Sequence, residues 1–142
     1  MSQYILPEGC ITLPDEDVLD VSITLLRFPS RGTSLTITRA PLPPGQDAGE
    51  LYRQQLEQVS KKQRHFVIRE QRETRAGING DVPGTEILCQ YDQHDATVCQ
   101  YQFSGQCGQS MVVFCYSRMG NFIHDDMVHW QGILASLVPA DN

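Results

Sequence analysis

The sequence has no apolar run long enough to cross a membrane. A transmembrane helix needs about 20 consecutive apolar residues, and no window of this 142-residue chain approaches that. The opening residues, MSQYILPEGC, also lack the basic stretch and apolar run of a secretory leader. We therefore expect a cytoplasmic protein.

Basic residues are scarce as well. Eleven Lys and Arg face 17 Asp and Glu, which gives a net charge of -6. A general nucleic-acid binder needs a basic surface to neutralise phosphates. The cluster Lys61, Lys62 and Arg64 falls at the end of a predicted helix, where cations complement the helix dipole. We therefore expect no nucleic-acid partner.

The motifs of metal sites, disulfide frameworks and common enzymes are also missing. The five cysteines form no CxxC pair and are odd in number, so we expect reduced thiols, mostly buried in strands. Glycine-rich phosphate loops, GxSxG and HExxH are absent. We expect no cofactor and no catalytic activity. One catalytic alternative is a metal-dependent hydrolase built on His124, Asp125 and His129, in a group that also contains Asp126, although the two histidines are five residues apart and lie on different helix faces. The other is a Cys/His nucleophile, for which the sequence has no local signature.

The stretch from Val21 to Arg39 predicts a β-hairpin. Two runs rich in β-branched and apolar residues flank the turn residues Pro29 to Gly32. Because side chains alternate along a strand, Val21, Ile23 and Leu25 point to one side, and Leu26 and Phe28 point to the other. A strand that is apolar on both sides needs cover on both sides.

The rest of the chain predicts a single α+β domain over residues 1–142. A first strand is expected from Tyr4 to Leu13, a helix from Asp47 to about Gln63, and a second helix from Asp125 or Asp126 to about Leu137. Four more strands are expected at about 65–76, 85–91, 96–104 and 110–117. We expect an antiparallel, possibly mixed, sheet of six to seven strands, with both helices packed on one side. The uncovered side would then need a partner.

Glutamines mark two further places. Gln55 falls within the apolar stripe of the first helix, where it either lies at the rim or meets something other than the protein's own core. Six of the 14 glutamines lie between Gln90 and Gln109, and Gln100 and Gln102 share one face of their strand. Neutral amides offer donors and acceptors without the desolvation cost of a charge. This face is either solvated surface or a contact for an apolar partner that still has polar atoms to satisfy.

Taken in order, several short motifs resemble the Eag family of type VI secretion chaperones, relatives of the DcrB and PsbP-like α+β fold. The likeness runs over roughly residues 4–139, and it rests on Tyr4-Ile5-Leu6, Leu13-Pro14-Asp15, Ser22-Ile23-Thr24-Leu25 with Phe28-Pro29, Gln55-Leu56-Glu57 and Leu137-Val138-Pro139.

The resemblance implies a cytoplasmic homodimer that shields the N-terminal transmembrane helices of a PAAR-domain effector and helps to load it on the secretion spike. It also implies that the bound helices contact Val21, Ile23, Leu25, Gln55, Gln100 and Gln102. Ile23 and Leu25 could instead meet a second subunit, and the match along the glutamine strand could shift by two residues. The alternative function is a small hydrophobic-ligand or lipid-binding domain of the same fold.

Overall fold

A computed structural model describes residues 2–18 and 20–140 of the chain. Its secondary structure consists of β1 (Ser2–Leu6), β2 (Gly9–Leu13), β3 (Ile23–Phe28), β4 (Thr33–Pro41), α1 (Ala48–Lys62), β5 (Arg64–Ala76), β6 (Val82–Gln93), β7 (Ala96–Cys107), β8 (Ser110–Met119) and α2 (His124–Ala135). In this described part, no helix is long and apolar enough to span a membrane.

Six strands form one antiparallel sheet in the order β3-β4-β8-β7-β6-β5, which leaves β3 and β5 at its two edges. The predicted α+β class, the hairpin at β3 and β4, and the β6-β7-β8 meander are confirmed. The turn between β3 and β4 closes through hydrogen bonds from the backbone N–H groups of Arg31 and Gly32 to the carbonyl of Phe28, both 2.9 Å. Gly32 has a φ of 73°, a conformation that glycine adopts without steric cost.

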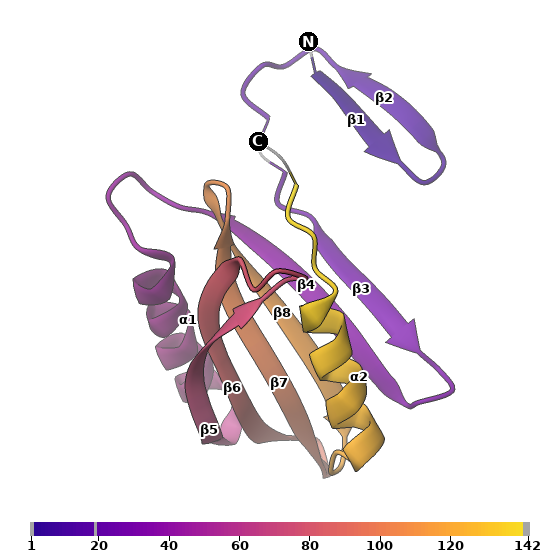
Figure 1. The fold of residues 1–142 in the computed structure, drawn as a ribbon, viewed down its shortest axis with the longest axis vertical. Coiled ribbons are helices and arrows are strands. Elements are labelled where there is room, and N and C mark those ends of the chain that lie inside the picture. Colours follow the sequence, from indigo (N-terminus) through magenta and orange to yellow (C-terminus); the bar gives the residue numbers. More distant parts are fainter. Residues whose placement is uncertain (1, 19, 141–142) are drawn as a thin grey trace.

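The first predicted strand, Tyr4 to Leu13, is in fact a hairpin of two strands. β1 and β2 pair with each other as a separate two-stranded sheet, with Tyr4 opposite Ile11. Pro7 cannot donate a hydrogen bond and Gly9 has a φ of 150°, so the chain reverses between them. Figure 1 shows this hairpin projecting beyond the body of the molecule.

The two helices lie on opposite faces of the large sheet, so the prediction that they share one side is wrong (Figure 1). Trp130 and Leu134 of α2 pack with Phe103 and Tyr116 on one face. On the other face α1 packs through a second apolar cluster, formed by Ala48, Tyr52, Ile87, Cys89, Met111 and Val113. The physical reason is that the central strands are apolar on both faces. β8, for example, buries an unbroken run at 111–114.

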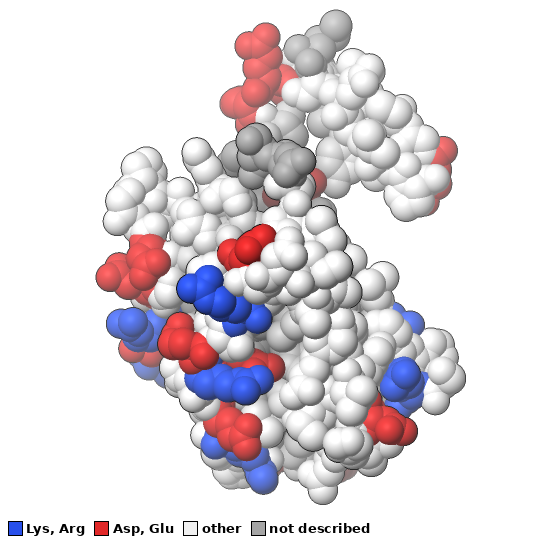
Figure 2. Space-filling model, in the orientation of Figure 1, with Lys and Arg blue, Asp and Glu red and all other residues white. Residues whose placement is uncertain are grey.

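Buried polar bonds join α2 to the sheet. The Trp130 indole N–H donates to Glu86 Oε2 at 2.6 Å, and the Arg72 guanidinium holds the other oxygen of that buried carboxylate at 2.6 Å. At the start of α2, Asp126 accepts hydrogen bonds from Arg118 at 3.1 Å and from the Ile123 backbone N–H at 2.9 Å. Figure 2 views the α2 side and shows charged side chains gathered over β5, with a broad uncharged surface over α2.

We expect Trp130→Phe to destabilise the fold by about 3 kcal/mol, because it opens a cavity and removes a donor from the buried Glu86 carboxylate. Urea unfolding measures this free energy. The matched control is Val128→Ala on the same helix, where the side chain is 53% exposed, and its expected change is within about 0.5 kcal/mol. Equal losses for the two variants would contradict the anchoring role of Trp130.

Candidate functional site

The part of the α1-side sheet surface that α1 does not cover is the candidate site, and we call it the open face. Register places its residues on one side of the sheet, since directly paired residues of antiparallel strands share a face. Leu25 pairs with Thr36, Thr36 with Cys115, and Cys115 with Gln102. The open face therefore consists of Ile23, Leu25, Thr36, Thr38, Gln100, Gln102, Cys115 and Ser117.

The open face brings together four of the residues predicted to bind a partner: Ile23, Leu25, Gln100 and Gln102. The two aliphatic side chains lie on the edge strand β3 and are 67% and 53% exposed. Gln100 and Gln102 lie three strands away on β7 and are half-buried. These four residues therefore form the two margins of one surface, with β4 and β8 between them.

The other two predicted site residues are exposed and lie outside the strands of the open face. Val21 precedes β3 and is 68% exposed. Gln55 is exposed on α1, one helical turn after Leu51, which packs against the apolar cluster under the helix. The fully buried positions in the apolar stripe of α1 are Ala48 and Tyr52. The exposure of Gln55 is compatible with a place at the rim of the stripe and with a contact to a partner, so both alternatives stay predictions.

The glutamines of the open face bond to one another and to two tyrosines. Tyr52 Oη donates to Gln102 Oε1 at 2.8 Å, Gln102 Nε2 donates to Gln100 Oε1 at 2.9 Å, and Gln100 Nε2 donates to the Tyr91 hydroxyl at 3.2 Å. This chain, the amide ladder, links α1 to β7 and β6. Sequence reasoning missed both tyrosines. The sequence did contain a signal for Tyr52. This residue falls in the apolar stripe of the helix, and a buried phenol needs a hydrogen-bond partner.

The residues named as the open face carry no formal charge, but Arg27 continues the same face of β3 two positions after Leu25 and pairs with Ser34. Burial raises the pKa of Cys115 to about 11 and that of Cys89, beneath the ladder, to about 12, so both stay protonated at neutral pH. Burial also raises the pKa of Tyr52. Toward the β3–β4 turn the surface deepens into a hollow of about 690 Å³, whose lining includes Tyr91, Ser117 and Met119 together with two cations, Arg27 and Arg118. The threonine, serine and glutamine side chains of the open face can offer hydroxyl and amide groups to a partner, whereas an occupant of the hollow would also meet the two arginines.

The residues of the hydrolase alternative are not brought to one centre. Asp126 is buried and turned toward Arg118 and Ile123, whereas His129 Nδ1 lies 2.8 Å from the Tyr116 hydroxyl. Burial lowers the pKa of His129, with Arg31 adding to the effect. In residues 2–18 and 20–140, no group of three or more His, Cys, Asp or Glu side chains has the geometry to hold a metal ion.

Comparison with known proteins identifies a family and several solved structures with a similar fold. The profile of the DcrB family matches residues 8–136. A crystal structure of PA94 from Pseudomonas aeruginosa, described as a protein of unknown function and a candidate regulator, superposes with a TM-score of 0.74 at 18% identity, over 100% of this chain and 99% of that one. At this identity the likeness shows the fold. No curated protein matches the chain.

We expect Tyr52→Phe to lower the free energy of unfolding by about 1 kcal/mol, because it leaves the Gln102 carbonyl without its buried donor. Tyr91→Phe, at the half-exposed end of the amide ladder, should cost less than about 0.5 kcal/mol, since water can replace the phenol. Urea unfolding of both variants checks the order. A larger cost for Tyr91→Phe would show that the ladder is anchored at its other end.

Proposed function

The chain belongs to the DcrB family, and from this premise we propose that it is a non-enzymatic chaperone and adaptor of the Eag type. In this proposal it acts in the cytoplasm, holds the N-terminal transmembrane helices of a PAAR-domain type VI secretion effector, and helps to load that effector on the secretion spike. The observation that carries the proposal is the open face, an uncovered sheet surface beside α1 with exposed aliphatic side chains at its margin.

The dimensions of the open face suit a helix. β3, β4 and β8 are neighbours in the sheet, and three strands at a spacing of about 4.8 Å span roughly 10 Å between the outer two. An α-helix with its side chains is about 10 Å wide. A bound helix would therefore lie beside α1 in the manner of helix-in-groove recognition. Each Å² of apolar surface removed from water would contribute roughly 25 cal/mol.

The chemistry of the open face suits a transmembrane helix better than an ordinary amphipathic one. Its middle consists of Thr36, Thr38, Cys115 and Ser117, which are small, neutral and half-buried. Transmembrane helices often carry small residues and isolated polar groups that allow close packing and interhelical hydrogen bonds. The amide ladder would supply partners for such groups, while Ile23 and Leu25 would cover the apolar flank.

A homodimer would use a different surface, the β1–β2 hairpin. Tyr4, Leu6, Ile11 and Leu13 share one face of the hairpin, because Tyr4 pairs with Ile11 and alternate residues point the same way. A lone two-stranded hairpin is only marginally stable in water, yet this one projects from its own body (Figure 1). We therefore assign its apolar face to a second copy of the chain, which leaves Ile23 and Leu25 for the effector.

Charging the margin of the open face should abolish effector binding. We expect Ile23→Asp and Leu25→Asp each to lose the soluble complex when co-expressed with an effector's N-terminal hydrophobic region, because a carboxylate against an apolar helix is costly to desolvate. Affinity purification followed by gel densitometry measures the complex. An effector that lacks its transmembrane segments should not bind the unaltered protein.

The matched control is Leu26→Asp, which places the same charge on the next residue of β3 but on the opposite face. Leu26 is 46% exposed, so the variant should fold and retain the complex. Thermal melting confirms that all three variants are folded. A complex that survives Ile23→Asp and Leu25→Asp at unchanged levels would remove the open face from consideration.

Dimerisation should depend on the hairpin. We expect the double variant Leu6→Asp with Ile11→Asp to be monomeric by light scattering at concentrations where the unaltered protein is a dimer, because two carboxylates would interrupt the apolar face. The control pair, Gln3→Asp with Thr12→Asp, charges the other face of the same hairpin and should stay dimeric. If both double variants stay dimeric, or if both become monomeric, the dimer interface does not lie on the apolar face of the hairpin.

A further inference from the structure

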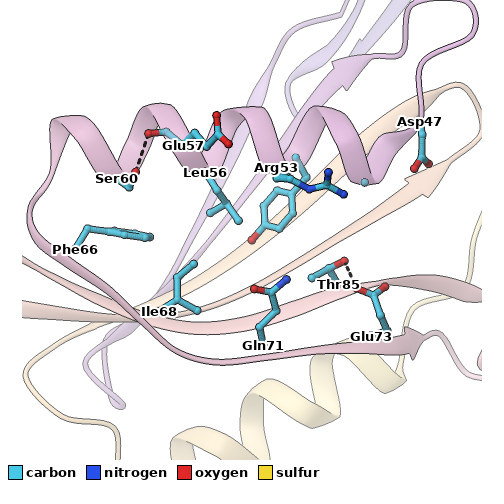
Figure 3. Close-up of a pocket in the computed structure, with 12 residues that line it drawn as sticks. Asp47, Arg53, Leu56, Glu57, Ser60, Phe66, Ile68, Gln71, Glu73 and Thr85 are labelled. Atoms are coloured by element: carbon cyan, nitrogen blue, oxygen red, sulfur yellow. Dashed lines mark hydrogen bonds between the residues drawn. The ribbon is translucent and has the colours of Figure 1, made fainter.

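A second hollow, of about 470 Å³, lies between α1 and β5 (Figure 3). We call it the α1–β5 groove. Its two ends differ in character. Leu56, Phe66 and Ile68 line one end, and Gln71, Glu73 and Thr85 lie toward the other. Tyr52 of α1 contributes to the lining, while its hydroxyl is bonded to the amide ladder.

β5 borders this groove with a free edge. It is the last strand of the sheet, so within residues 2–18 and 20–140 no strand pairs with its outer side. Phe66, Ile68, Gln71 and Glu73 line the groove in succession along β5, with a register irregularity between Ile68 and Glu70. An unpaired strand edge presents a row of backbone donors and acceptors to another extended chain. A strand added there would place alternate side chains in the groove.

The charges of the groove favour a basic occupant. Asp47, Glu57 and Glu73 line it together with a single cation, Arg53. In the described part of the chain, none of the three carboxylates takes part in an ion pair, and Glu73 accepts a hydrogen bond from the Thr85 hydroxyl at 2.9 Å. Like charges repel, so this excess of carboxylates disfavours a fatty acid or an anionic lipid headgroup.

We propose that the α1–β5 groove binds an extended peptide segment of a partner protein, which adds as a strand to the free edge of β5. An apolar side chain of the segment occupies the end lined by Leu56, Phe66 and Ile68. A basic side chain four residues away meets Glu73. Side chains two residues apart point to the same side of a strand, and two such steps lead from the apolar end of the groove to Glu73. Backbone pairing supplies affinity, and the two side chains supply selectivity.

The surrounding surface restricts which segments can pair. Arg69, Glu70 and Arg72 place charges of both signs on β5, and exposed edge strands avoid indiscriminate pairing by this means. α1 separates the groove from the open face, and Tyr52 crosses between them to Gln102. The site is thus distinct from the surface proposed for transmembrane helices, and its test is independent of that proposal.

The test is an NMR titration of the full, isotope-labelled chain with the synthetic peptide Ac-GTLTSTKTG-NH2, which carries Leu and Lys four positions apart. We expect saturable shifts of the backbone amides of β5 and of the α1 residues that line the groove. Replacing the peptide's Lys by Glu should weaken binding about fivefold, the size of an exposed ion pair. Replacing its Leu by Ser should weaken binding more, because the apolar end would be left unfilled.

Reversing the charge at Glu73 distinguishes specific recognition of the peptide from a general structural effect of the substitution. Glu73→Lys should prefer the peptide with Glu over the peptide with Lys, which reverses the original order. The matched control is Glu50→Lys, a change of the same charge on α1 outside the groove lining, and it should retain the original order. The proposal is overturned if no β5 amide shifts, if the shifts fall on the open face, if Glu73→Lys leaves the order unchanged, or if oleate shifts these amides and neither peptide does.

Discussion

A single α-helix is too narrow to cover one face of a six-stranded sheet. Six strands at a spacing of about 4.8 Å span roughly 24 Å, whereas a helix with its side chains is about 10 Å wide. The sheet of this protein has one helix on each face. α1 packs against β5, β7 and the Met111–Val113 part of β8, and it leaves the surface of β3, β4 and the Cys115–Ser117 part of β8 uncovered. The open face follows from this mismatch in width.

The position of α1 depends on polar as well as apolar contacts. Its buried Tyr52 packs over Ile87 and Cys89 and also starts the amide ladder through Gln102. A neutral network that satisfies its own donors and acceptors can lie under a helix without the cost of burying charge. The same network then continues into the open face, where its outer groups can meet a partner. One set of side chains thus contributes both to the fold and to the chemistry of the proposed site.

The two edges of the sheet differ for a physical reason. β3 is short, apolar on both faces and lies beside the open face, whereas β5 is long and carries charges of both signs. An apolar edge favours hydrophobic association, and a charged edge selects for complementary charge. For this chain of the DcrB family, we therefore propose different partners for the two edges. A transmembrane-type helix is proposed for the side of β3, and an extended basic segment for β5.

The sequence by itself determined the local structure. Alternation placed Ile23 with Leu25 and Gln100 with Gln102 on defined faces, turn residues located the β3–β4 hairpin, and Asp47 located the start of α1, because these features depend on neighbours in the chain. The prediction for β1 and β2 was wrong, because the chain reversal at Pro7 and Gly9 was interpreted as an interruption within one strand. Only the tertiary structure decided that the helices lie on opposite faces and that Tyr52 and Tyr91 end the amide ladder. These features depend on which of two apolar faces each helix covers, and a strand that is apolar on both sides encodes no such choice.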